Sequence, residues 1–240
     1  MATTTDRSRR TRETARRADT TKRLDVDVII EAGLRLGSVR GTDSISVRAL
    51  GAELDADPTA IYRHFRSKDD LMRGLLDALH LIVLERLTFP DAWQDRLIEL
   101  ADVTLAVHIE YAAIVMEAVA LTTGGPGEAR TIEHILGAFS DAGLADADVV
   151  QHYALLGSYM LSRTASIARS RSTRDDARDR TAWIDAPLLI DPVRQPHAAA
   201  FAARLSELKD EDIYRLGIRS IIQSAERTVA GEASGEGGVR

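Results

Sequence analysis

Apolar residues recur every three or four positions along most of this 240-residue chain, which is the spacing of helices that bury one face. The first such stripe contains Val28, Ile29, Ala32 and Leu36. Aromatic residues make up only 5% of the chain, and Ala and Leu dominate its apolar residues. This balance favours helices over β-sandwiches. We therefore predict an all-α protein.

Capping signals divide residues 24–80 into four helices, three of them short. Glycines at 37 and 41 can end the first helix, which begins near residue 24. The third covers Pro58–Phe65, because proline suits the first position of a helix. The last three helices each follow a side chain that can cap an N-terminus: Ser46, Asp57 and Ser67.

A boundary at Phe89-Pro90 separates this region from a longer helical one. Glycines near residues 124 and 143 divide the longer region. The helices predicted there cover residues 91–107, 109–122, 127–142, 146–170, 197–208 and 210–230, with an exposed connection over 171–196. The predicted domains are a disordered basic arm at 1–23, a first helical domain at 24–80, a larger helical domain at 81–230 and a flexible tail at 231–240.

Charge is distributed unevenly along the chain, whose net charge is −6. Residues 1–23 contain eight basic and three acidic residues, whereas residues 81–240 contain 16 basic and 24 acidic residues. A basic end on an acidic body fits a protein that meets a polyanion at one end only. Two interpretations of the arm stay open: it enters the minor groove of DNA, or it is a solubilising tail with diffuse attraction to phosphate.

Two short helices joined by a tight turn, over residues 46–54 and 58–65, have the form of a helix-turn-helix. The sequences Ser46-Val47-Arg48-Ala49-Leu50-Gly51-Ala52-Glu53-Leu54 and Pro58-Thr59-Ala60-Ile61-Tyr62-Arg63-His64-Phe65-Arg66-Ser67-Lys68-Asp69-Asp70-Leu71 closely resemble the tetracycline-repressor (TetR) family of regulators. The likeness is contiguous over about residues 24–80. Beyond it, the chain matches the family in length and helical character only. The resemblance implies an N-terminal three-helix helix-turn-helix domain followed by a larger helical ligand-binding and dimerisation domain.

The same resemblance implies roles for seven residues at the DNA. Thr59 and Ala60 begin the recognition helix, which reads bases. Arg63 occupies a variable position and either grips guanine or contacts phosphate. Tyr62, His64 and Lys68 are expected to contact the phosphate backbone, and Arg48 is expected to contact a base edge or a phosphate. Each of these side chains has a structural interpretation when taken alone, but together they favour binding to a double-stranded operator.

The larger domain is expected to form a homodimer and to enclose a small-molecule effector. The family resemblance places the dimer helices near residues 146–170 and 210–230 and implies a near-palindromic operator. Gly157 and Gly217 permit close helix approach there, although the same apolar stripes also suit the core of one chain. Polar or aromatic residues among apolar neighbours are the candidate effector contacts, and each has a purely structural alternative: Trp93, His108, Tyr111, Met116, His134, Tyr153 and Tyr159. The Ala-, Leu-, Val- and Ile-rich helices favour an apolar effector.

The chain lacks the residue patterns that identify common enzyme classes. The chain has no cysteine, which excludes disulfides, thiolate nucleophiles and cysteine–zinc sites. It contains no His-Glu-x-x-His, and Gly124-Gly125-Pro126-Gly127 lacks the lysine of a phosphate loop. We expect no catalytic residues, metal or cofactor. The sequence also predicts no membrane helix and no signal peptide, hence a cytoplasmic protein.

The function predicted from the sequence is a DNA-binding transcriptional regulator, by family default a repressor that an effector releases. The alternative is a helical ligand-sensing or protein-interaction module that has lost DNA binding. Salt-sensitive, sequence-specific DNA binding separates the two.

Overall fold

The structure is a computed structural model that describes residues 24–39, 44–173, 181–184, 186 and 188–235. Ten α-helices lie in this described part, in which no β-strand occurs beyond one isolated bridge between Ala182 and Lys209. The prediction of an all-α protein is confirmed. The basic arm expected over residues 1–23 lies outside the described residues.

The N-terminal head consists of α2 (Val26–Gly37), α3 (Val47–Glu53) and α4 (Pro58–Ile61). The predicted caps are confirmed. Ser46 Oγ accepts the N–H of Ala49 at 3.0 Å, and an Asp57 oxygen accepts that of Thr59 at 2.8 Å. The predicted helix at Pro58–Phe65 is too long, because the N–H groups of Arg63 and His64 bond to the carbonyl three residues back. These tighter turns replace α-helical geometry after Ile61.

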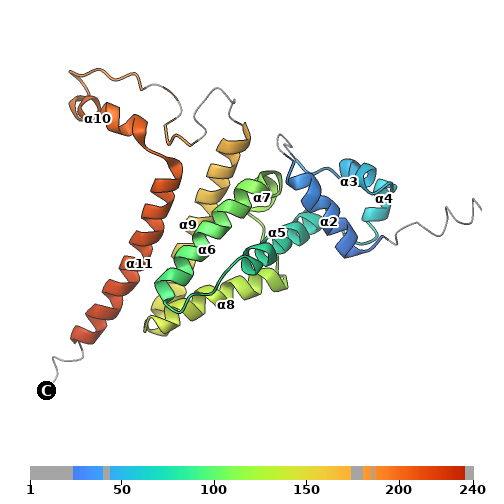
Figure 1. Cartoon of the computed structure of the whole chain (residues 1–240), viewed down its shortest axis with the longest axis horizontal. Coiled ribbons are helices and arrows are strands. Elements are labelled where there is room, and N and C mark those ends of the chain that lie inside the picture. Colours follow the sequence, from blue (N-terminus) through green and yellow to red (C-terminus); the bar gives the residue numbers. More distant parts are fainter. Residues whose placement is uncertain (1–23, 40–43, 174–180, 185, 187, 236–240) are drawn as a thin grey trace, which may run out of the picture.

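Helix α5 (Lys68–Glu85) leaves the head and enters the larger helical body without a break (Figure 1). Ser67 Oγ accepts the N–H of Asp70 at 3.0 Å, and the Asp70 carboxylate accepts the N–H of Arg66 at 2.9 Å. This reciprocal pair is the capping arrangement that the sequence predicted. A single helix therefore crosses the boundary that the sequence places between residues 80 and 81.

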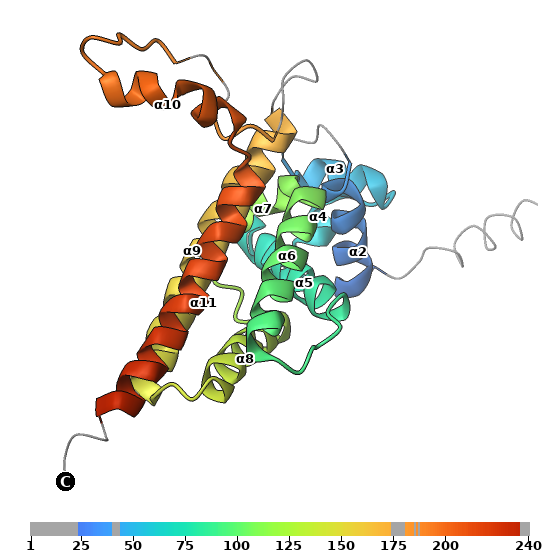
Figure 2. The same ribbon diagram turned by 60° about the vertical axis from the view of Figure 1, so that its left-hand side comes forward.

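The body is formed by α5 together with α6 (Trp93–Glu110), α7 (Ala112–Ala118), α8 (Pro126–Asp141), α9 (Asp146–Thr173) and α11 (Asp210–Gly235). The long helices α9 and α11 lie side by side along one edge of the molecule (Figure 2). Helix α10 (Pro196–Glu207) buries none of its residues and lies apart from the body in both views (Figures 1 and 2). No helix in the described part of the chain is long and apolar enough to cross a membrane.

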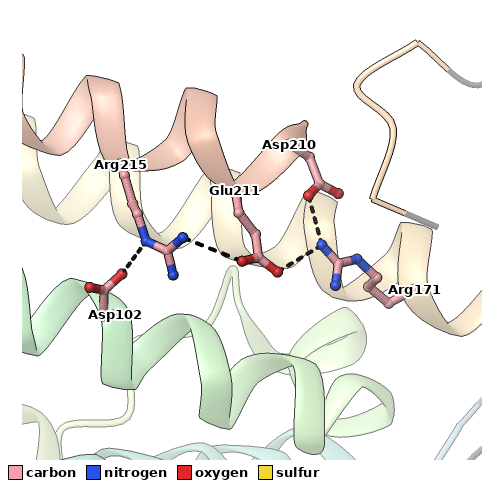
Figure 3. A network of polar contacts seen from close by, with 5 residues as sticks. All are labelled: Asp102, Arg171, Asp210, Glu211 and Arg215. Carbon is pink, nitrogen blue, oxygen red and sulfur yellow. Dashed lines mark hydrogen bonds and ion pairs between the residues drawn. The ribbon is translucent and has the colours of Figure 1, made fainter. Parts of the chain in front are cut away.

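Polar contacts fix α11 against α6 and α9 within one chain (Figure 3). Arg215 pairs with Asp102 of α6 at 2.9 Å, and Arg171 of α9 pairs with Asp210 at 2.7 Å and with Glu211 at 3.0 Å. The fully buried Tyr214 hydroxyl donates to the carbonyl of Ala101 at 3.0 Å. One face of α11 is therefore intrachain core, the alternative that the sequence left open.

Glycine 217 confirms this intrachain packing. A Cβ at this position would overlap the ring of Tyr159 on α9. The Tyr159 hydroxyl donates to the carbonyl of Ile213 at 3.0 Å, and its ring stacks on that of Tyr214. Gly217 thus permits the close approach that we predicted, with α9 of the same chain. At Gly157 a Cβ would meet no atom within 4 Å.

Candidate DNA-binding face and ligand cavity

The turn between α3 and α4 is tight, because one of its residues adopts a positive φ and a backbone hydrogen bond closes it. Asp55 has a positive φ of 50°, and the N–H of Ala56 bonds back to the carbonyl of Gly51 at 2.9 Å. A Cβ at Gly51 would lie only 2.8 Å from the carbonyl oxygen of Ala56, which is too close. Glycine at this position therefore permits the chain to reverse between the two helices.

The structure exposes six of the seven residues expected at the DNA and half-buries the seventh, Ala60. Tyr62 is 48% exposed although it is aromatic, whereas the neighbouring Ile61 and Phe65 are buried in the core. The recognition segment thus turns its apolar side inward and its polar side outward. The exposed residues are Arg48, Thr59, Tyr62, Arg63, His64 and Lys68.

An acidic group lies among these side chains. The hydroxyl of Thr59 donates to Asp57 at 2.6 Å, in addition to the backbone bond that caps α4. These two bonds lower the pKa of Asp57, with a smaller contribution from the Arg63 charge. Asp57 therefore stays ionised and fixes the start of the recognition segment.

Glu117 of α7 joins the body to the head. Its carboxylate pairs with Lys68 Nζ at 2.6 Å and accepts the backbone N–H of Ile45 at 3.0 Å. The Lys68 side chain remains 44% exposed, whereas that of Glu117 is 21% exposed. A residue of the body thus holds the lysine that we expect to contact DNA phosphate.

The body encloses a cavity between α5, α6, α8 and α9. Its volume is about 90 Å³, and part of it is open to solvent. Most of its wall is aliphatic, with a few polar groups. The lining residues are Leu76, His80, Val83, Thr104, His108, Val119, Leu121, Glu128, Thr131, Ile132, Ile135, Tyr153, Gly157, Met160 and Leu161.

Two of the polar lining residues are histidines held by threonines. His108 Nδ1 lies 2.7 Å from Thr164 Oγ1, and His80 Nδ1 lies 3.2 Å from Thr131 Oγ1. Burial lowers the pKa of His108 to about 3, with a smaller effect of nearby His80. Burial also lowers the pKa of His80 against the opposing effect of Glu128. Both imidazoles are therefore neutral at pH 7.

Helix α5 also anchors the N-terminus of α8. The buried Asp77 carboxylate accepts the N–H groups of Gly127 at 3.1 Å and Glu128 at 2.9 Å. A Cβ on Gly125 or Gly127 would overlap Asp77. The glycine-rich break that we predicted at residues 124–127 thus brings a carboxylate of one helix against the N-terminus of another, which is electrostatically favourable.

Two of the seven residues proposed from the sequence as effector contacts, His108 and Tyr153, line this cavity. The other five lie elsewhere. Trp93 packs near Phe139, and His134 meets the ring of Phe89. Tyr111 lies at the junction of α6 and α7, and Met116 Sδ accepts from Ser172. Tyr159 stacks on Tyr214.

Sequence reasoning missed His80, Thr104, Glu128 and Thr131, which also line the cavity. A local signal exists for one of them. His80 follows Leu76 by four residues and precedes Val83 by three, which places it on an inward-facing stripe of α5. The other three have no such signal, because their place in the wall depends on how α6 and α8 pack. In the described part of the chain, no three His, Asp or Glu residues come together to hold a metal ion.

Comparisons with known proteins agree with this architecture. The family model described as "Bacterial regulatory proteins, tetR family" matches residues 29–75. The model described as "Tetracyclin repressor-like, C-terminal domain" matches residues 88–224. The first match contains α3 and α4, and the second covers most of the body.

Individual relatives extend over most of the chain. The HTH-type transcriptional repressor DrrR1 of Streptomyces coeruleorubidus is 24% identical over 217 residues, which are 86% of this chain and 79% of the relative. The HTH-type transcriptional repressor Rv1353c of Mycobacterium tuberculosis is 26% identical over 234 residues, 90% of this chain and 87% of the relative.

Solved structures show the same fold. The Streptomyces coelicolor TetR family protein ActR, in complex with actinorhodin, has a TM-score of 0.71 at 19% identity. The match covers 86% of this chain and 98% of that one. Together with the family models, these likenesses establish that the chain belongs to the TetR family of bacterial regulatory proteins and is a helix-turn-helix transcriptional regulator.

Proposed function

We propose that this protein is a repressor that binds a near-palindromic operator as a homodimer and is released by a small, mainly apolar effector. The observation that carries the proposal is the continuity of α5. This helix bears Lys68 at the DNA-binding face and, two to four turns later, the cavity residues Leu76, His80 and Val83. A change in the cavity can therefore move the head.

The exposed face of the head supports the DNA-binding part of the proposal. Tyr62, Arg63 and His64 extend outward from the recognition segment, and Lys68 follows at the start of α5. In this role Tyr62, His64 and Lys68 contact phosphate, and Thr59, Ala60 and Arg63 face the bases. Arg48 approaches the DNA from α3.

Exposed apolar residues on the two long helices support the dimer. Val150 and Leu155 of α9 are 59% and 49% exposed, and Leu216 of α11 is 54% exposed. Burial of such side chains against a second copy is favourable. A dimer would place two recognition segments on successive major grooves about 34–36 Å apart, which is why the operator should be near-palindromic.

The cavity supports effector binding. Its aliphatic wall suits an apolar molecule, and His108 and Tyr153 supply polar contacts in it. The relative ActR has been solved with actinorhodin bound. An effector that stabilises a different position of α5 would weaken DNA binding by the difference in its affinity for the two states.

Fluorescence-anisotropy titration tests the proposal, with DNA from upstream of the gene for this protein and a scrambled sequence in parallel. We expect tight binding to the first DNA that weakens steeply as salt rises. Replacing Tyr62 and Lys68 together by Ala should abolish the preference. Loss of the Lys68 charge alone should lower the slope of log K against log salt by about 0.9 per protomer.

Phe201 and Arg204 on α10 provide the matched control. They are an exposed aromatic residue and an exposed cation, like Tyr62 and Lys68, on a helix that lies apart from the head. Replacing both by Ala should leave DNA binding unchanged. If genome-wide selection of bound fragments yields no preferred sequence, the protein is a helical sensor that does not recognise DNA.

A further inference from the structure

The two histidines of the cavity are held in the same way, and the arrangement decides which ring nitrogen carries the proton. Nδ1 of each histidine shares one hydrogen bond with a threonine hydroxyl on another helix. Each of these threonine hydroxyls also makes a second hydrogen bond, to a backbone carbonyl. Thr164 Oγ1 lies 2.8 Å from the carbonyl of Met160, and Thr131 Oγ1 lies 3.0 Å from the carbonyl of Gly127.

A carbonyl oxygen can only accept, so each threonine must donate its hydroxyl proton to the carbonyl four residues back. In the alternative, the hydroxyl proton would point to the histidine and leave two oxygens 2.8 Å apart at Thr164 with no proton between them. The hydroxyl oxygen can then only accept from the histidine. Nδ1 of both His80 and His108 therefore carries the proton, and Nε2 of both carries a lone pair.

This tautomer leaves both Nε2 atoms as acceptors available to the cavity. Within the described part of the chain, neither Nε2 has a hydrogen-bond partner. Since both rings line the cavity, the free nitrogens are the polar groups that they offer to a bound molecule. Thr164 itself is fully buried, so the effector would not touch the residue that sets the tautomer of His108.

The other residues that line the cavity limit the charge and polarity of the molecule that it can bind. The only charged residue that lines the cavity in the described structure is Glu128, and none of the described lining residues is Lys or Arg. An anionic effector would meet a like charge without a compensating cation, at a high cost of burial. The aliphatic lining meanwhile requires an apolar body.

We propose that the effector is an uncharged, mainly apolar compound that bears hydroxyl groups, and that it donates hydrogen bonds from these hydroxyls to Nε2 of His80 and His108. This inference deepens the proposed function, since it rests on the cavity being the effector site. Thr164 and Thr131 act as positioning residues, because they set the acceptor character of the histidines without supplying it.

The tautomer can be measured without any effector or DNA. The chain has six histidines, so ¹⁵N-histidine labelling of the full-length protein gives a simple spectrum, in which His80→Gln and His108→Gln identify two spin systems. The couplings between ring nitrogens and ring carbon-bound protons should show Nδ1 protonated in both. A proton on Nε2 of His108 would overturn the proposal, whatever the protein binds.

Ligand selectivity is measured with four naphthalene probes that differ in one substituent, by the change in their fluorescence on binding. 2-Naphthol should bind about tenfold more tightly than 2-methoxynaphthalene, which has the same ring and no donor. It should also bind more tightly than 2-naphthoate and naphthylmethylammonium. Equal or weaker binding of the naphthol than of the ether overturns the hydroxyl assignment, and tighter binding of the ammonium probe assigns a cationic effector instead.

Thr164→Val separates the tautomer from the shape of the cavity. It removes the acceptor at Nδ1 of His108 and should shift the proton of that ring towards Nε2, which should reduce the preference for naphthol over its ether to the part that His80 supplies. Thr228→Val is the matched control, because Thr228 Oγ1 makes the same bond to the carbonyl four residues back, on α11 and outside the cavity. Unchanged selectivity in Thr164→Val would show that its bond to His108 does not set the acceptor. Failure of DNA binding with intact naphthol selectivity would reject the repressor function and leave this inference standing.

Discussion

Lowering the pH from 7 to 5 should destabilise this protein, and the buried His108 should contribute a measurable part of the loss. Burial lowers the pKa of His108 from 6.5 to about 3. In the unfolded chain this imidazole gains a proton near pH 6.5, whereas in the native protein it stays neutral down to about pH 3. The stability that depends on neutral His108 is therefore complete above pH 6.5 and decreases as the pH falls towards 3.

The size of the effect follows from that difference. Each pH unit between the two values contributes about 1.4 kcal/mol, so the loss at pH 5 is about 2 kcal/mol. A loss of this size lowers Tm by roughly 4–8 °C in a chain of this length. Urea unfolding at pH 7 and at pH 5, at one protein concentration, measures the free energy directly.

His108→Asn provides the reference. Its amide can donate the same hydrogen bond to Thr164, and it does not titrate in this range. Burial also lowers the pKa values of His80 and His134, and these contributions are common to both proteins. We expect the variant to lose about 2 kcal/mol less than the wild type between pH 7 and pH 5. Equal losses in both proteins would refute a neutral, buried His108.

Three further predictions concern packing, the head and the arm. Gly217→Ala should displace Tyr159 and lower the free energy of unfolding by about 1–3 kcal/mol. Gly137→Ala is the control, because a Cβ there meets no atom within 4 Å, and it should be neutral or stabilising. Equal urea midpoints for the two variants would contradict this prediction. Glu117→Gln keeps an acceptor for the N–H of Ile45 and removes the ion pair to Lys68, so operator affinity should rise by up to about fivefold. A rise of the same size in a Lys68→Ala background would show that the effect does not depend on Lys68. Deleting residues 1–20 should weaken DNA binding and flatten its salt dependence if the arm enters the minor groove, and an unchanged affinity and slope would assign it as a tail.

The local features of the head could be predicted because they depend on neighbours in sequence. Ser46, Asp57 and Ser67 each cap a helix within three residues of themselves, as expected. The end of α4 could not be predicted in this way, since the choice between bonds to the third and fourth preceding carbonyl is a small energetic difference that packing decides.

The cavity could be predicted only in part. A polar residue on an apolar stripe identified His108 and Tyr153, but the same signal selected Trp93, His134 and Tyr159, which lie elsewhere. Helical periodicity shows that a side chain faces inward. It does not show whether the neighbour on that side is another side chain or empty space.

The helices, their caps and the family can be recognised from the order of the residues alone, because these depend on a period of 3.6 residues and on contiguous motifs. Which distant groups meet depends on how the helices pack. Thr164 reaches His108 across 56 positions, Asp77 caps α8 across 50, and Glu117 holds Ile45 across 72. Such pairs depend on the angles and offsets at which helices pack, and one helical stripe is compatible with many of these. The regulator is thus recognisable from its residues in order, whereas the chemistry of its cavity depends on how α5, α6, α8 and α9 come together.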